Sequence, residues 1–195
     1  MGVMTTGHAS IPTGRPFTVA DLEAMPDDGN RYELIDGMLL VSPAPDWPHQ
    51  EMGAELFFQL RLRFPPGVRV LTAPFAVRTG TDSEVQPDVL VARFADLNRN
   101  SKNLPVAPLL AVEVLSPSTR LKDLNLKKAH YERIGVDAYW ILDPKEPGAL
   151  TVFELDGGIY SQVAHVEAEA EFVATRPFPV TVVPARLLDG LRPRE

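Results

Sequence analysis

The chain of 195 residues contains no cysteine. Disulfide bonds, thiol nucleophiles and cysteine-ligated zinc sites are therefore excluded, and the fold has to be held together by its hydrophobic core. The length is sufficient for such a core and favours a single domain. Because 45% of the residues are hydrophobic and 23% are charged, the composition is that of a globular protein and not of a disordered or fibrous one.

Long hydrophobic runs and an excess of positive charge are also absent. No apolar stretch approaches the roughly 20 residues of a membrane span, and the N-terminal sequence lacks the pattern of a secretory signal, so we expect a cytoplasmic protein without a membrane partner. Lys and Arg total 19 against 26 Asp and Glu, a net charge of −7. This balance disfavours broad, non-specific coating of nucleic acid and leaves a local binding site open.

Several common enzyme motifs are missing as well. The sequence has no G-x-x-x-x-G-K-[ST] loop, no G-x-G-x-x-G, no H-E-x-x-H and no G-x-S-x-G. These absences disfavour nucleotide-driven motors, dinucleotide-dependent enzymes, zinc peptidases and α/β-hydrolases.

Apolar periodicity and turn residues predict an α/β fold. An Asp-Gly pair between the strand-like runs 31–35 and 38–41 is typical of a β-hairpin, and the segment from Pro48 to Phe64 has helical, amphipathic spacing. Further predictions are strands at 68–72, 75–78, 88–92, 109–115 and 138–142, a loop at 80–84, a helix ending at Ile134, and C-terminal strands after residue 144. The apolar strands predict a mixed β-sheet flanked by helices, with the N-terminal hairpin and C-terminal antiparallel strands added to it.

The domain organisation expected from this order is simple. Residues 1–16 are rich in Gly, Thr, Ser and Pro and predict a flexible N-terminal arm. Residues 17–195 form one domain, with a core at about 31–155 and a C-terminal β extension at about 156–195.

Two acidic residues stand on strands that otherwise have the composition of buried strands. Glu113 is the only charged residue of Leu109–Leu115, and strand alternation places it on the same face as Ala111. A buried carboxylate must be paired, protonated or bound to a metal, unless it reaches solvent at the strand end. Asp88 stands similarly at the start of a strand, where turn chemistry is the alternative explanation. Together, the two acids indicate a functional site.

A lysine on the following helix belongs to the same pattern. Lys127 lies within a helical stripe of Leu124, Tyr131 and Ile134, so it is expected to point toward the sheet. It either extends its ammonium group to solvent or pairs with the buried acids. Glu33 is a further candidate on the N-terminal hairpin.

Two or three carboxylates without a His or Cys cluster are hard oxygen ligands, which suit Mg²⁺ or Mn²⁺ better than zinc. Such a cation beside a lysine is suited to phosphodiester hydrolysis. The metal activates water, and the lysine orients or deprotonates that water or stabilises the developing charge.

The sequence resembles the PD-(D/E)XK restriction-endonuclease-like superfamily and, more closely, a large bacterial family of restriction-endonuclease-like proteins known mostly as a domain of unknown function. The matching segments are 31–37, 42–45 with His49, 86–88, 112–119, Asp123 with Lys127 and Tyr131, and 135–140. The resemblance covers about residues 17–153. It implies a restriction-endonuclease-like α/β core, Mg²⁺ (or Mn²⁺) as cofactor, DNA as substrate, and a homodimer, because cutting both strands needs two sites.

The resemblance also implies roles for individual residues. The catalytic positions are Glu33, Asp88, Glu113 and Lys127, the accessory positions are His49 and Tyr131, and the metal ligands are Asp88, Glu113 and the backbone carbonyl of Val114. Leu115 stands where the superfamily has its lysine, and Lys127 on the next helix takes the matching position. His49 alone would be interpreted as a helix cap or a surface residue.

Three functions follow from these residues. The first is a Mg²⁺-dependent endodeoxyribonuclease. The second, favoured by the displaced lysine and the acidic balance, is a catalytically inactive nucleic-acid- or protein-binding module that retains the fold. The third is a structural protein with a buried ion network. Residues 61–78 hold four arginines and no acid, whereas residues 154–171 hold five acids and no Lys or Arg. This uneven charge predicts a local, metal-dependent contact with DNA.

Overall fold

The computed structural model describes residues 14–193. Residues 1–13, which make up most of the predicted N-terminal arm, lie outside the described residues. Within the described part, the Arg15 guanidinium pairs with the Asp21 carboxylate at 2.7 Å, and the Phe17 amide donates to the Gly37 carbonyl at 2.9 Å. The chain therefore makes specific contacts from residue 15 onward. No helix within residues 14–193 is long and apolar enough to cross a lipid bilayer.

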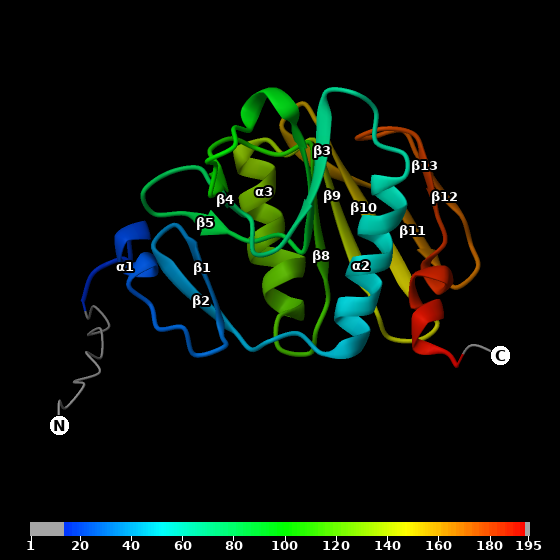
Figure 1. Ribbon diagram of the computed structural model, residues 1–195, viewed down its shortest axis with the longest axis horizontal. Coiled ribbons are helices and arrows are strands. Elements are labelled where there is room, and N and C mark those ends of the chain that lie inside the picture. The colour runs from blue at the N-terminus through cyan, green and yellow to red at the C-terminus, as the bar shows by residue number, and fades with distance from the viewer. Residues whose placement is uncertain (1–13, 194–195) are drawn as a thin grey trace.

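A six-stranded mixed sheet forms the centre of the molecule, between α2 on one face and α3 on the other (Figure 1). Its strands, in spatial order, are β11 (Ile159–Glu167), β10 (Ala149–Asp156), β9 (Ala138–Asp143), β8 (Leu110–Val114), β6 (Val89–Arg93) and β3 (Val68–Thr72). Only β8 and β9 are parallel neighbours, and the other pairs are antiparallel. The predicted mixed sheet is confirmed, and β10 and β11 continue it.

The alternation predicted for β8 explains how the sheet divides two hydrophobic cores. Leu110 and Val112 pack with Met52 and Leu56 of α2 (Trp47–Arg61), whereas Ala111 packs on the opposite face with Tyr131 of α3 (Lys128–Ile134). Glu113 shares that second face because strand residues alternate. The charged side chain of Glu113 therefore lies under α3 and cannot reach solvent on the α2 side of the sheet.

A second, five-stranded sheet lies on the α3 side of the molecule (Figure 1). Its strands, in spatial order, are β2 (Met38–Ser42), β1 (Arg31–Ile35), β5 (Glu84–Val85), β4 (Ala76–Arg78) and β7 (Asn103–Leu104). The predicted hairpin is present, and Asp36 and Gly37 turn it with φ values of 51° and 75°. The loop predicted at 80–84 ends one residue too late, because Glu84 begins β5. That strand is too short to have a periodicity of its own and exists through pairing with β1 and β4.

The helix after β8 begins with an irregular turn. Residues Lys122–Lys127 form a π-helical segment, η2, which continues as α3 and ends at Gly135 with a left-handed φ of 84°. Asp123, Lys127, His130 and Tyr131 are its buried polar and aromatic residues. The remaining elements are α1 (Val19–Glu23), η1 (Phe94–Asp96), β12 (Phe172–Ala174), β13 (Val180–Val182) and η3 (Pro184–Leu191).

His130 makes folding stability sensitive to acid. Its side chain is buried, its Nδ1 lies 3.0 Å from the Arg133 guanidinium, and burial together with the charge of Arg133 lowers its pKa to about 4. Unfolded protein therefore takes up this proton near pH 6.5 and folded protein only near pH 4, so stability falls as the pH drops through this window. This lowering of the His130 pKa corresponds to on the order of 3 kcal/mol of the free energy of unfolding.

The measurement is the free energy of unfolding in urea as a function of pH, for His130→Gln and for wild type. In the variant, the free energy of unfolding is expected to decline much less between pH 6.5 and pH 4 than in wild type. His165→Gln is the matched control, because His165 is exposed on β11. Equal pH slopes in wild type and His130→Gln would show that His130 does not cause the acid sensitivity.

Candidate active site

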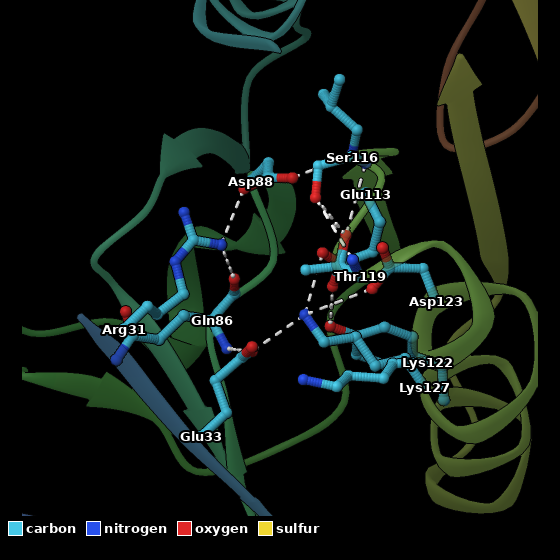
Figure 2. Close-up of polar contacts among 12 residues, drawn as sticks. Arg31, Glu33, Gln86, Asp88, Glu113, Ser116, Thr119, Lys122, Asp123 and Lys127 are labelled. Atoms are coloured by element: carbon cyan, nitrogen blue, oxygen red, sulfur yellow. Dashed lines mark hydrogen bonds and ion pairs between the residues drawn. The ribbon is translucent and has the colours of Figure 1, made fainter. Parts of the chain in front are cut away.

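The four predicted catalytic residues meet in one pocket, at the point where β1, the start of β6, the end of β8 and η2 come together (Figure 2). The pocket has a volume of about 190 Å³. Its lining includes Glu33, His49, Asp88, Glu113, Val114 and Lys127. Tyr131 lies behind Glu113 and is fully buried. Segments up to 94 positions apart in the sequence, from Glu33 to Lys127, therefore form a single polar cavity.

Lys127 is the centre of this cluster. Its ammonium Nζ lies 3.0 Å from Glu33 Oε1, 3.0 Å from Glu113 Oε2 and 3.8 Å from Asp123 Oδ1. Burial alone would lower the pKa of Lys127, but the negative charges of these acids raise it above its usual value. The side chain therefore keeps its proton at neutral pH. It can orient water or stabilise negative charge, and it is a poor general base.

Glu113 is buried at the end of β8 and uses both carboxylate oxygens. Oε1 accepts a hydrogen bond of 2.7 Å from the Tyr131 hydroxyl, and Oε2 accepts one from Lys127. Burial raises the pKa of Glu113 well above its usual value; Lys127 opposes this shift, and the neighbouring acids add to it. A positive charge brought into the pocket would therefore stabilise the ionised form of Glu113.

Asp88 lies just before β6, and its pKa is shifted in the direction opposite to that of Glu113. Its Oδ1 accepts a 2.8 Å hydrogen bond from Arg31, and its Oδ2 accepts one of 2.8 Å from the Val114 amide and lies 3.2 Å from His49 Nε2. Burial would raise the pKa of Asp88, but the His49 hydrogen bond and the Arg31 charge lower it below its usual range. Asp88 is therefore ionised at neutral pH.

His49 and Glu33 are positioned by their secondary structures. The Asp46 side chain caps α2 by accepting the His49 amide at 3.1 Å, which leaves the His49 ring free to face Asp88 from the first turn. His49 thus belongs to the pocket and is not a surface residue. Glu33 Oε1 accepts the Gln86 amide at 2.8 Å in addition to Lys127. This bond ties the hairpin to the segment that leads into Asp88.

Comparison with known proteins identifies the family of the chain and its fold. The sequence profile of the Uma2 family, described as "Putative restriction endonuclease", matches residues 19–186. The chain belongs to the Uma2 family. A crystal structure described as "a putative nuclease belonging to DUF820" from Anabaena variabilis ATCC 29413 superposes with a TM-score of 0.68. The two are 19% identical, and the match covers 83% of this chain and 90% of that one.

The family membership and the shared fold confirm the predicted resemblance and the predicted nuclease-like α/β architecture. No curated protein matches the chain. The roles of individual residues stay a prediction of the sequence and of the geometry of this Uma2 protein.

Arg31 and Asp123 are pocket residues to which the sequence assigned no role and which contact the predicted site residues. Arg31 holds Asp88, and it could have been found because it stands two residues before Glu33 and therefore faces the same side of β1. Asp123 stands four residues before Lys127, which places both on one side of a helix. Its burial next to Lys127 depends on how η2 packs against the sheets, which helical spacing alone does not show.

The donors of the pocket suit a hard divalent cation, because they are carboxylate oxygens. Within residues 14–193, no three His, Asp or Glu side chains are already arranged to hold a metal ion. Lys127 lies among Glu33, Glu113 and Asp123 where a cation would bind. Mg²⁺ commonly uses only one or two protein carboxylates together with water and substrate phosphate. Asp88, which is ionised, and Glu113, which lines the same pocket, fit that mode of binding.

Proposed function

We propose that this Uma2 protein is a Mg²⁺- or Mn²⁺-dependent endodeoxyribonuclease that hydrolyses phosphodiester bonds. The observation that carries the proposal is the buried Lys127 ammonium, held at 3.0 Å by both Glu33 and Glu113 in the pocket that also contains the ionised Asp88. A protonated lysine beside carboxylates of contrasting pKa is the arrangement expected for catalysis of phosphoryl transfer to water. Membership of a restriction endonuclease family supports the same reaction class.

In this proposal, Asp88, Glu113 and the Val114 backbone carbonyl hold the divalent cation. When bound, the cation supplies an activated water molecule and neutralises charge on the phosphate in the transition state. Lys127 holds the attacking water or stabilises the developing negative charge with its ammonium group. Glu33 positions Lys127 from the opposite side of the pocket (Figure 2).

Three further residues orient this machinery. Tyr131 keeps its proton, because burial and the charge of Glu113 raise its pKa well above the usual value, and it therefore donates steadily to Glu113. Arg31 and His49 hold Asp88 from two directions and fix its carboxylate plane. Arg31 also lines the pocket, where its guanidinium group can pair with a DNA phosphate.

The alternative function is a nucleic-acid- or protein-binding module that retains the nuclease fold. The observation in its favour is that Glu113 is already paired with Lys127 and Asp88 with Arg31, and that the described residues contain no three-ligand metal site. The homodimer implied by the resemblance stays a prediction, and light scattering on the purified chain measures it.

Cleavage of supercoiled plasmid DNA separates the two functions. Wild type is expected to nick and linearise plasmid with Mg²⁺ or Mn²⁺ and to be inactive in EDTA, whereas Asp88→Ala and Glu113→Ala are expected to be inactive with either metal. Asp156→Asn, at the exposed end of β10, is the control that keeps activity. Equal cleavage by all four proteins would reveal a contaminating nuclease, and no cleavage of DNA or RNA by wild type would favour the binding module.

A further inference from the structure

Asp123 contains an unusual polar atom. Its side chain is 2% exposed and lines the pocket, yet Oδ1 has no hydrogen-bond partner. The nearest cation is Lys127 Nζ at 3.8 Å, which is too far for a hydrogen bond. Buried polar atoms are nearly always hydrogen-bonded, so an unpartnered carboxylate oxygen inside a polar cavity requires an explanation.

The local backbone holds Asp123 in this position. Asp123 is the second residue of the π-helical segment η2, and such segments commonly occur at functional sites. The Asp123 amide donates to the Thr119 carbonyl at 3.0 Å, and the Asp123 carbonyl accepts the buried Tyr139 hydroxyl at 3.0 Å. Both backbone groups are therefore satisfied, and only the side chain is left without a partner on one oxygen.

The positive charge of Lys127 does not require a third carboxylate. The ammonium already lies 3.0 Å from Glu33 and 3.0 Å from Glu113, so two carboxylates surround one positive charge without Asp123. Asp123 adds a further negative charge to a buried cluster that is already acidic, which is unfavourable unless more positive charge enters. A carboxylate oxygen is a ligand that Mg²⁺ and Mn²⁺ prefer.

We infer that Asp123 is an additional ligand of the divalent cation, which it binds through Oδ1 in competition with the Lys127 ammonium. This inference rests on the proposed metal dependence and extends the ligand set beyond Asp88 and Glu113. When the cation enters, Lys127 remains paired with Glu33, and the oxygens of Asp123 and Glu113 that face the ammonium become available. The same acids thus bind the lysine in the metal-free protein and the cation in the loaded one.

Isothermal titration of the full chain with Mn²⁺, without DNA, tests the ligand directly. Asp123→Asn is expected to bind Mn²⁺ at least roughly tenfold more weakly than wild type, whereas Asp156→Asn, which makes the same chemical change at an exposed position, is expected to bind like wild type. The melting temperature in EDTA shows that each variant is folded. Equal Mn²⁺ affinity of Asp123→Asn and wild type would overturn the inference.

A second variant tests the competition. Lys127→Met removes the competing ammonium and is expected to bind Mn²⁺ at least roughly tenfold more tightly, read from a larger rise of melting temperature with added Mn²⁺. Weaker binding by Lys127→Met would contradict the competition.

The inference and the proposed function fail in different ways. Loss of Mn²⁺ binding in Asp123→Asn, with no DNA cleavage by wild type, would support the ligand and remove the nuclease. Unchanged Mn²⁺ binding in Asp123→Asn, with metal-dependent cleavage by wild type, would remove the ligand and keep the nuclease. Absence of Mn²⁺ binding by wild type would overturn both.

Discussion

Replacing Lys127 with methionine is expected to lower the free energy of unfolding by about 3–5 kcal/mol at neutral pH and to abolish DNA cleavage. Methionine fills a similar volume but leaves Glu33 and Glu113 buried without their shared counter-charge, and breaking a buried ion pair from one side has a cost of this size. Urea unfolding measures the stability, and plasmid nicking measures the activity.

The pH dependence of the Lys127→Met variant distinguishes this cause from simple loss of packing. Without the ammonium, the folded-state pKa of Glu113, which burial already raises, rises further, while the unfolded chain still loses this proton near pH 4. Between the two values the folded state binds more protons, so stability falls as the pH rises and recovers on acidification. A deficit that is constant with pH would indicate a packing defect.

Lys128→Met is the matched control for the neighbouring position. Lys128 lies over the Phe153 ring at 4.7 Å, outside the carboxylate cluster, so its replacement is expected to cost less than about 1 kcal/mol and to leave cleavage intact. If Lys127→Met cleaved DNA like wild type, Lys127 would have no part in the reaction.

Replacing Glu113 with glutamine is expected to reduce the cleavage rate on the order of 10³-fold while the protein stays as stable as wild type or becomes more stable. Glutamine has the same shape and keeps an oxygen that can accept from Lys127. It removes the negative charge of the buried carboxyl group, whose pKa is raised by burial. It also removes a proposed anionic ligand of the cation. Activity and stability therefore change in opposite directions, as they do where function needs an unfavourable group.

Glu169→Gln, on an exposed turn, is the control for the same chemical change and is expected to alter neither quantity. Single-turnover cleavage at saturating Mg²⁺ gives the rate, and thermal unfolding gives the stability. A Glu113→Gln variant that cleaves at the wild-type rate would exclude a charged ligand at this position.

The sequence by itself determined most of the secondary structure and indicated which charged residues lie on buried faces. The Asp-Gly turn, the alternation through Leu110 and Val112, and the helical position of Lys127 all reappear in the structure because they depend on local spacing. A lone acid on an apolar strand indicates that some other part of the chain must neutralise it. That argument selects Glu113 without any knowledge of its partner.

Only the tertiary structure decided how these residues are combined. β5 has no pattern of its own, and its pairing with β1 brings Glu33 to the Gln86 amide and to Lys127. The π-helical turn that buries Asp123 beside Lys127 likewise depends on packing between the two sheets. The physical reason is that local periodicity records which side of an element is buried, whereas the distance between two charges is set by how separate elements pack together.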